Sequence, residues 1–171
     1  MRFFVTVFLS FFVYTVFSQN DDSDFIEKDS LIYIKQQPSK GFYNDYVLFI
    51  PKETPLNKKI VLVIEPNNTG KTSDSIEVHK KSAIDLATKS SVGNNIATLL
   101  KIPLLVPVFP RPAAQPMLYT HALDRDVILD EVATHKRLDL QLLAMIKDAK
   151  KLLNNRNIVV DEKVFMSGFS A

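Results

Sequence analysis

Short apolar blocks separated by turn-forming residues run along most of the chain. Several of these blocks are rich in β-branched and aromatic residues, the composition that favours strands. We expect strands at residues 31–34, 46–50, 59–64, 104–109 and 164–166. The third block is continuously apolar, which predicts burial on both faces of a sheet. A proline inside the fourth block should weaken its pairing at that point.

Two longer segments carry apolar residues at helical spacing. The first runs over residues 76–87, and Asp74 or Ser75 can cap its start. A turn-forming run at residues 93–95 is expected to interrupt it, with a short second helix directly afterwards. The second segment, residues 138–153, is the clearest amphipathic helix in the chain.

The order of these elements is typical of an α/β domain. After two leading strands, strand, helix, strand, helix and strand alternate, which calls for a mostly parallel sheet with helices on its faces. The leading strands are joined by a shorter loop and should form an antiparallel pair at one edge. Parallel sheets of this kind carry their chemistry at the carboxyl ends of the strands. Loops at residues 65–70, 107–112 and 168–171 leave those ends.

Composition argues against several classes of protein. The 171 residues suffice for one domain with a real core, and 46% of them are hydrophobic. A net charge of +2 without a basic stripe and interleaved aromatic residues argues against nucleic-acid binding. The sequence contains no cysteine, which removes disulfides, thiolate metal sites and a cysteine nucleophile. The histidines lack partners at metal-ligand spacing, and we expect neither a metal nor a cofactor.

Residues 1–18 have the pattern of a secretory signal peptide. A positive residue precedes an apolar stretch, and Val16 and Ser18 suit the minus-three and minus-one positions of a cleavage site. The stretch is shorter than the roughly 20 residues that span a bilayer; an uncleaved anchor is the alternative. We expect a secreted or periplasmic protein with no stable membrane insertion after cleavage. Residues 19–30 would form a flexible lead-in to a domain at residues 31–171.

The candidate nucleophile is Ser170, which follows the last predicted strand. Gly168 stands two residues before it, the spacing of a Gly-x-Ser-x-Gly elbow, a tight strand-to-helix turn that exposes the serine hydroxyl. A hydroxyl becomes a nucleophile once a base removes its proton. The backbone N–H of Ala171 would be the first oxyanion donor, because the residue after the nucleophile has that role. The alternative is an ordinary turn in which Ser170 caps a helix.

A second oxyanion donor is expected in the loop after the third predicted strand. In such sheets this donor comes from the loop after an earlier strand. Asn67 and Asn68 are the candidates, because Pro66 has no N–H to donate. The alternative is a plain polar turn between a strand and a helix.

The histidines do not complete a triad with Ser170. In a hydrolase with this elbow the acid and then the histidine follow the serine, whereas His79, His121 and His135 all precede it. We expect His79 on a helix surface and His135 in solvent near a helix start. His121 is a candidate for the substrate pocket, with a surface position as the alternative. The base and the acid are therefore expected beyond residue 171.

At these residues the chain resembles the α/β-hydrolase superfamily, and within it exported bacterial esterases of the polyhydroxybutyrate-depolymerase or feruloyl-esterase kind. The resemblance covers roughly residues 43–171 and rests on the order of three segments, at residues 60–70, 104–112 and 165–171. It implies a partial α/β-hydrolase fold, truncated at the nucleophile elbow, with Ser170 as the nucleophile.

The chain departs from the superfamily pattern in two ways. The usual His-Gly oxyanion loop is replaced by Glu65, Pro66, Asn67 and Asn68. The later acid, histidine and strands are absent from these residues. The first departure bears on the substrate class and the second on the activity of this polypeptide.

We therefore expect the N-terminal part of a secreted serine hydrolase that cleaves small or polymeric carboxylic esters when it is full length. The 171 residues by themselves should be inactive. A peptidase of the same fold is one alternative, and a catalytically inactive binding module or fragment is another. A sheet that stops at its nucleophile strand exposes an edge and one face, so we also expect poor solubility.

Overall fold

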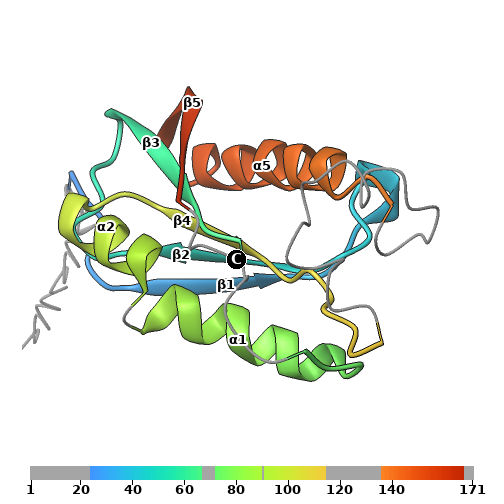
Figure 1. The fold of residues 1–171 in the computed structure, drawn as a ribbon. Helices are drawn as coiled ribbons and strands as arrows, with labels where there is room; N and C mark the ends of the chain where they lie inside the picture. The colour runs from blue at the N-terminus through green and yellow to red at the C-terminus, as the bar shows by residue number, and fades with distance from the viewer. Residues whose placement is uncertain (1–23, 67–71, 90, 115–135, 168–171) are drawn as a thin grey trace, which may run out of the picture.

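The computed structural model describes residues 24–66, 72–89, 91–114 and 136–167. Over these ranges the chain forms one sheet between two layers of helix (Figure 1). The segment expected to be a signal peptide, residues 1–18, lies outside the described residues. No helix in the described ranges has both the length and the apolar character needed to cross a bilayer.

The sheet has five strands in the order β1-β2-β4-β3-β5. They are β1 Ser30–Ile34, β2 Tyr46–Ile50, β3 Lys59–Ile64, β4 Leu104–Pro107 and β5 Val159–Met166. Each strand overlaps one of the predicted apolar blocks, because a β-branched or aromatic run packs well on a pleated, half-buried surface.

Strand pairing divides the sheet into an antiparallel and a parallel part. β1 and β2 form the predicted antiparallel edge pair, with Ser30 opposite Ile50. β2 also pairs antiparallel with β4. β3 pairs parallel with β4 on one side and with β5 on the other. The α/β class and the edge pair are confirmed, and the sheet is mixed, with parallel pairing among β3, β4 and β5.

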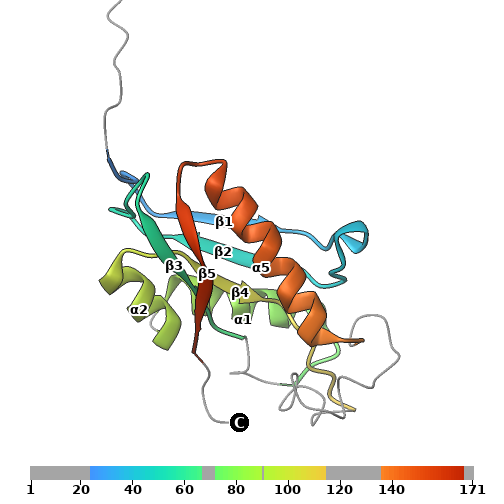
Figure 2. The same cartoon turned by 90° about the horizontal axis from the view of Figure 1, so that it is seen from above.

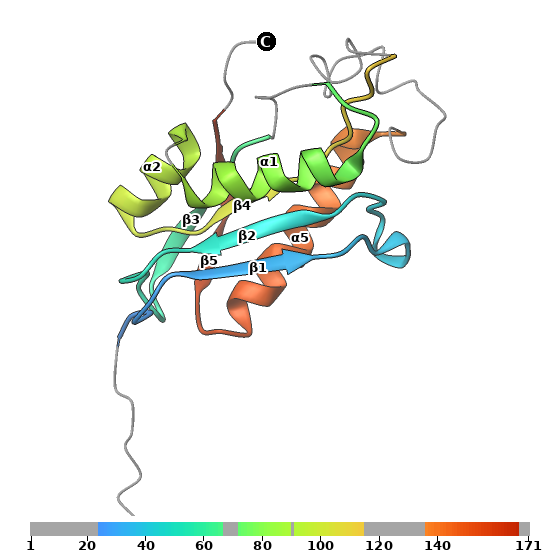
Figure 3. The ribbon, with the colours of Figure 1, turned by 90° about the horizontal axis from the view of Figure 1, so that it is seen from below.

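Helices cover both faces of the sheet in the described ranges. They are α1 Ile76–Thr88, α2 Val92–Leu100 and α5 Leu138–Asn154, with a short 3-10 helix, η1, at Pro38–Lys40. α5 covers one face (Figure 2), and α1 with α2 covers the other (Figure 3). Placement on opposite faces follows the expected alternation of strands and helices.

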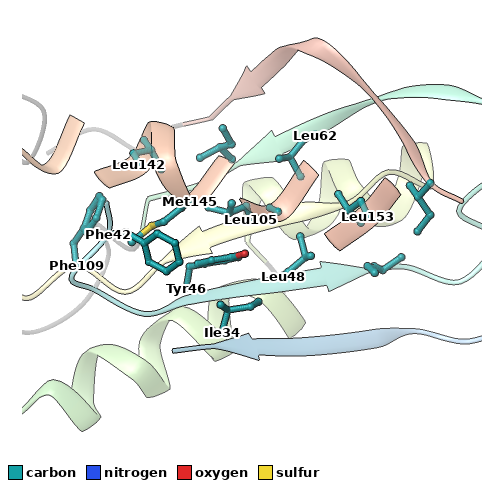
Figure 4. Close-up of a cluster of buried hydrophobic side chains, with 14 of the residues drawn as sticks. Ile34, Phe42, Tyr46, Leu48, Leu62, Leu105, Phe109, Leu142, Met145 and Leu153 are labelled. Carbon is teal, nitrogen blue, oxygen red and sulfur yellow. The ribbon is translucent and has the colours of Figure 1, made fainter. Parts of the chain in front are cut away.

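The larger core lies between α5 and the sheet (Figure 4). Leu142, Met145, Ala149 and Leu153 recur at helical spacing on α5 and are all buried. Phe42 and Tyr46 add an edge-to-face aromatic pair with ring centres 5.7 Å apart. The strands contribute further apolar side chains to this core, among them Ile34, Leu48, Ile50, Leu62, Ile64 and Leu105. Each large buried side chain contributes about 1.5–3 kcal/mol relative to exposure, so this face carries much of the stability.

The second core lies under α1 and α2 and is built around small side chains. Ala83, Ala87 and Ala97 are fully buried and allow both helices to approach the sheet closely. The strands contribute Val47, Val63, Leu104 and Val106 to this side.

The break between the two helices falls earlier than predicted. α1 ends at Thr88 and α2 begins at Val92, so residues 93–95 are helical and do not interrupt a helix. Ser91 is the N-cap of α2, and its Oγ accepts a hydrogen bond from Asn94 N at 3.0 Å. This cap satisfies an N–H of the first turn that would otherwise be unpaired, which favours a helix start here.

Three strand predictions also need correction. β4 ends at Pro107 and does not extend to residue 109, since a proline cannot donate to the ladder. β5 begins at Val159, well before the predicted residue 164. β3 is buried only from Leu62 onward, because it pairs with β4 only from Val63 and its first half pairs with β5 alone.

Candidate active site

The carboxyl ends of β3, β4 and β5 meet at one edge of the sheet because the three strands are parallel. The connection after β3 leads to α1 and α2 on one face, and the connection after β4 leads to α5 on the opposite face (Figures 1 and 3). Neighbouring strands whose connections leave toward opposite faces open a crevice at their carboxyl ends, where open α/β sheets bind ligands. This edge is the candidate active site.

Glu65 and Ser167 are the first residues beyond β3 and β5 at this edge. Ile64 pairs with Met166 at the end of the two strands, and Ser167 N donates a hydrogen bond to Ile64 O at 2.9 Å. On the other side of β3, Glu65 N donates to Leu105 O at 3.0 Å. The backbones that leave β3 and β5 therefore emerge side by side.

The Glu65 carboxylate is a buried structural anchor that sequence reasoning did not identify. Its side chain turns away from solvent, and the residue is 3% exposed. Oε2 accepts hydrogen bonds from Ser91 Oγ at 2.6 Å and from Gly93 N at 2.8 Å. The carboxylate lies at the N-terminus of α2, where the helix dipole favours negative charge. These contacts hold the end of β3 against the start of α2.

Gly93 is required for this approach. A Cβ atom at this position would lie 2.4 Å from Glu65 Oε2 and 3.0 Å from Leu104 Cδ1. Both distances are shorter than ordinary van der Waals contact. The glycine that suggested a helix break is in fact the residue that lets α2 receive the carboxylate.

His79 is buried, which corrects the expected position on a helix surface. It is 3% exposed, and its Nε2 lies 2.8 Å from Ser73 O and 3.1 Å from Arg111 N. One nitrogen cannot both donate to the carbonyl and accept from the N–H, so the tautomer of the ring selects which of the two contacts is a hydrogen bond. The ring thus joins the residues before α1 to those after β4.

Backbone and carboxylate contacts reinforce this junction. Ser73 N donates to Arg111 O at 2.7 Å, and Ala113 N donates to Asp74 Oδ1 at 2.9 Å. The Asp74 carboxylate is therefore hydrogen-bonded to the segment after β4. Ser75, the N-cap residue of α1, makes no side-chain cap hydrogen bond. A hollow of about 180 Å³ opens beside the junction, lined by Ser73, Asp74, Ile76, His79, Pro110 and Pro112.

The Ser167 hydroxyl is a second feature that sequence reasoning did not identify. The residue is 8% exposed, and within the described ranges its Oγ has no hydrogen-bond partner. A buried hydroxyl without a partner costs about 1–3 kcal/mol and therefore calls for an explanation. Its place directly after β5 would have been the available sequence signal.

The predicted site residues lie outside the described residues: Ser170, Ala171, Asn67, Asn68, His121 and His135. The structure therefore describes the strand ends and anchors that precede these positions. Within the described ranges, no group of three or more His, Asp or Glu side chains is arranged to hold a metal ion.

These observations define an α/β protein with a candidate active site at the carboxyl ends of its parallel strands. No protein family profile matches the chain, and no curated protein matches it. Among solved structures, the chain is similar to a crystal structure of a thermostable esterase, with 24% sequence identity and a TM-score of 0.40. The match covers 86% of this chain and 34% of the esterase, so the chain spans about a third of that protein's length.

Proposed function

We propose that this chain is the N-terminal part of a secreted serine hydrolase that cleaves carboxylic esters, with Ser170 as the nucleophile. The observation that carries the proposal is the pairing of β3 with β5. Ile64 and Met166 end side by side at the carboxyl edge of the sheet, and Ser170 follows Met166 by four positions. This is the place where a nucleophile elbow presents its serine in such a sheet.

The proposed chemistry is acyl transfer in two steps. Ser170 Oγ attacks the ester carbonyl carbon and its proton passes to a base, which then protonates the departing alcohol as the acyl–serine ester forms. Water, deprotonated by the same base, next attacks the acyl group and releases the carboxylic acid and the free serine. The backbone N–H of Ala171 and an N–H of Asn67 or Asn68 would stabilise the oxyanion in both steps. The start of the Asn67 segment is anchored through Glu65.

The base is assigned to a histidine beyond residue 171, together with an acid that orients it. His79 is unsuited to the role because its Nε2 is engaged by Ser73 O or Arg111 N in a buried position. A catalytic imidazole must instead reach the serine hydroxyl. His121 remains a candidate for the substrate pocket only. In this proposal the signal peptide directs the enzyme to extracellular or periplasmic esters, small or polymeric.

Fluorophosphonate labelling of the full-length gene product tests the proposal. The probe should attach to Ser170, and short-chain chromogenic esters should be turned over. Ser170→Ala should abolish both signals, whereas Ser39→Ala, at an exposed serine of η1, should preserve both. Absence of labelling in a folded protein would overturn the enzyme and favour a binding module. Labelling with turnover of peptides but not esters would favour a peptidase.

A further inference from the structure

A hollow of about 360 Å³ lies between η1 and α5. Its lining consists of Ser39, Lys40, Ala144, Lys147, Asp148 and Lys151. Ala144, Lys147, Asp148 and Lys151 recur at helical spacing and form one stripe on α5. The volume lies within the range of about 300–1,000 Å³ typical of small-molecule sites.

Asp148 fixes one wall of this hollow. The side chain is 5% exposed, and its Oδ1 accepts a hydrogen bond from Lys40 Nζ at 2.6 Å. Its Oδ2 accepts from Tyr46 OH at 2.8 Å. Both carboxylate oxygens are therefore engaged within the protein. The Lys40 ammonium is held at the mouth, where its side chain remains half exposed.

Lys147 and Lys151 add positive charge that the described residues do not neutralise. They stand four positions apart on α5, a spacing at which like charges repel and destabilise a helix. Neither forms an ion pair with any residue in the described ranges. The lining thus combines three ammonium groups with a single carboxylate.

We propose that this hollow binds the phosphate group of a phosphate monoester. The charge excess of the lining matches the two negative charges of that group, and lysine ammoniums bind phosphate as point charges. The Ser39 hydroxyl can donate a further hydrogen bond. The hollow is larger than a phosphate ion, and the remaining space beside Ala144 accommodates the organic part of the ester.

Thermal unfolding in the presence of inorganic phosphate and of glycerol 3-phosphate tests the site, with chloride at equal ionic strength as the reference. A ligand that binds only the folded state raises Tm as its concentration passes the dissociation constant. Both anions should raise Tm in a saturable way, and the ester should bind at least as tightly as phosphate. Added sodium chloride should weaken both affinities because it screens the charges.

Matched variants separate specific binding from the general stabilising effect of phosphate salts. Lys147→Gln with Lys151→Gln should weaken both affinities at least tenfold. Lys150→Gln removes the same kind of charge from the same helix, but Lys150 donates to Glu162 O and does not line the hollow. That variant should retain the wild-type affinities. Equal Tm shifts in wild type and the double variant, or an equal loss in Lys150→Gln, would overturn the proposal. Saturable binding of inorganic phosphate without binding of the ester would also overturn it.

Discussion

The Glu65 carboxylate accepts a hydrogen bond from the backbone nitrogen of Gly93 at 2.8 Å, and this contact ties the end of β3 to the start of α2. The same oxygen accepts from Ser91 Oγ. The pair joins residues 28 positions apart and determines where the chain leaves the sheet toward the segment that contains Asn67 and Asn68.

Removal of the Glu65 charge should destabilise the fold. Hydrogen bonds to charged groups contribute about 1.5–3 kcal/mol, and a buried donor left unpaired adds a further cost. We expect Glu65→Ala to lower the free energy of unfolding by about 2–4 kcal/mol, as measured by urea denaturation. Glu65→Gln keeps an acceptor oxygen and should lose less. A change below about 0.5 kcal/mol in Glu65→Ala, the range of a neutral surface substitution, would show that the anchor is energetically unimportant.

Gly93→Ala should be more damaging than its helical position suggests. Alanine is the better helix former by about 1 kcal/mol, but its Cβ would lie 2.4 Å from Glu65 Oε2. We expect a net loss of about 1–3 kcal/mol in the free energy of unfolding, as for other overpacked sites. Asn95→Ala, at an exposed position of the same helix, is the matched control and should be neutral or slightly stabilising. Stabilisation by Gly93→Ala would contradict the close approach.

Tyr46 should make stability fall at alkaline pH. Burial, and then the hydrogen bond to Asp148, raise the pKa of Tyr46 well above its ordinary value of 10.0. The unfolded chain therefore releases the phenol proton first as pH rises above 10, which favours unfolding. The stabilising contribution of Tyr46 to the free energy of unfolding is fully present below pH 10 and is lost as pH rises above it. Urea unfolding from pH 8 to pH 11 should show a steeper decline in wild type than in Tyr46→Phe, and parallel curves would refute the assignment.

Exposed apolar side chains should promote self-association. Leu99 on α2 is 80% exposed, and Phe165 on β5 is 48% exposed. Exposed apolar side chains offer a contact surface to another copy of the chain. We expect Leu99→Lys to reduce light scattering at high protein concentration, with the free energy of unfolding changed by less than about 0.5 kcal/mol. Thr98→Lys adds the same charge at an exposed neighbour and should have the smaller effect. Equal effects would point to net charge alone.

Much of the fold was predictable because local pattern and burial agree. The wholly apolar run of β2 and the helical spacing of Leu142, Met145 and Leu153 indicate their elements without any knowledge of neighbours. The antiparallel edge pair also followed from a short connecting loop. Boundaries were less predictable, because the Ser91 cap outweighed the turn-forming character of residues 93–95.

Part of the candidate site was also predictable from the sequence, and part was not. Ser170, Ala171, Asn67, Asn68 and His121 were selected by motif and order, and they remain predictions, since they lie outside the described residues. The buried roles of Glu65 and His79 could not be predicted from the sequence, because each depends on a partner distant in the chain. His79, for example, contacts Arg111, which lies 32 positions further along the chain.

The sequence alone determined the α/β class, most of the strands and the amphipathic face of α5, since side-chain period and turn chemistry act over a few residues. Only the tertiary structure decided that β4 lies between β2 and β3, that Glu65 turns inward onto α2, and that Lys40 binds Asp148 108 positions away. These features arise when helices and strands pack on opposite faces of one sheet. A buried charge then becomes stable only where the packing supplies its hydrogen-bond partners.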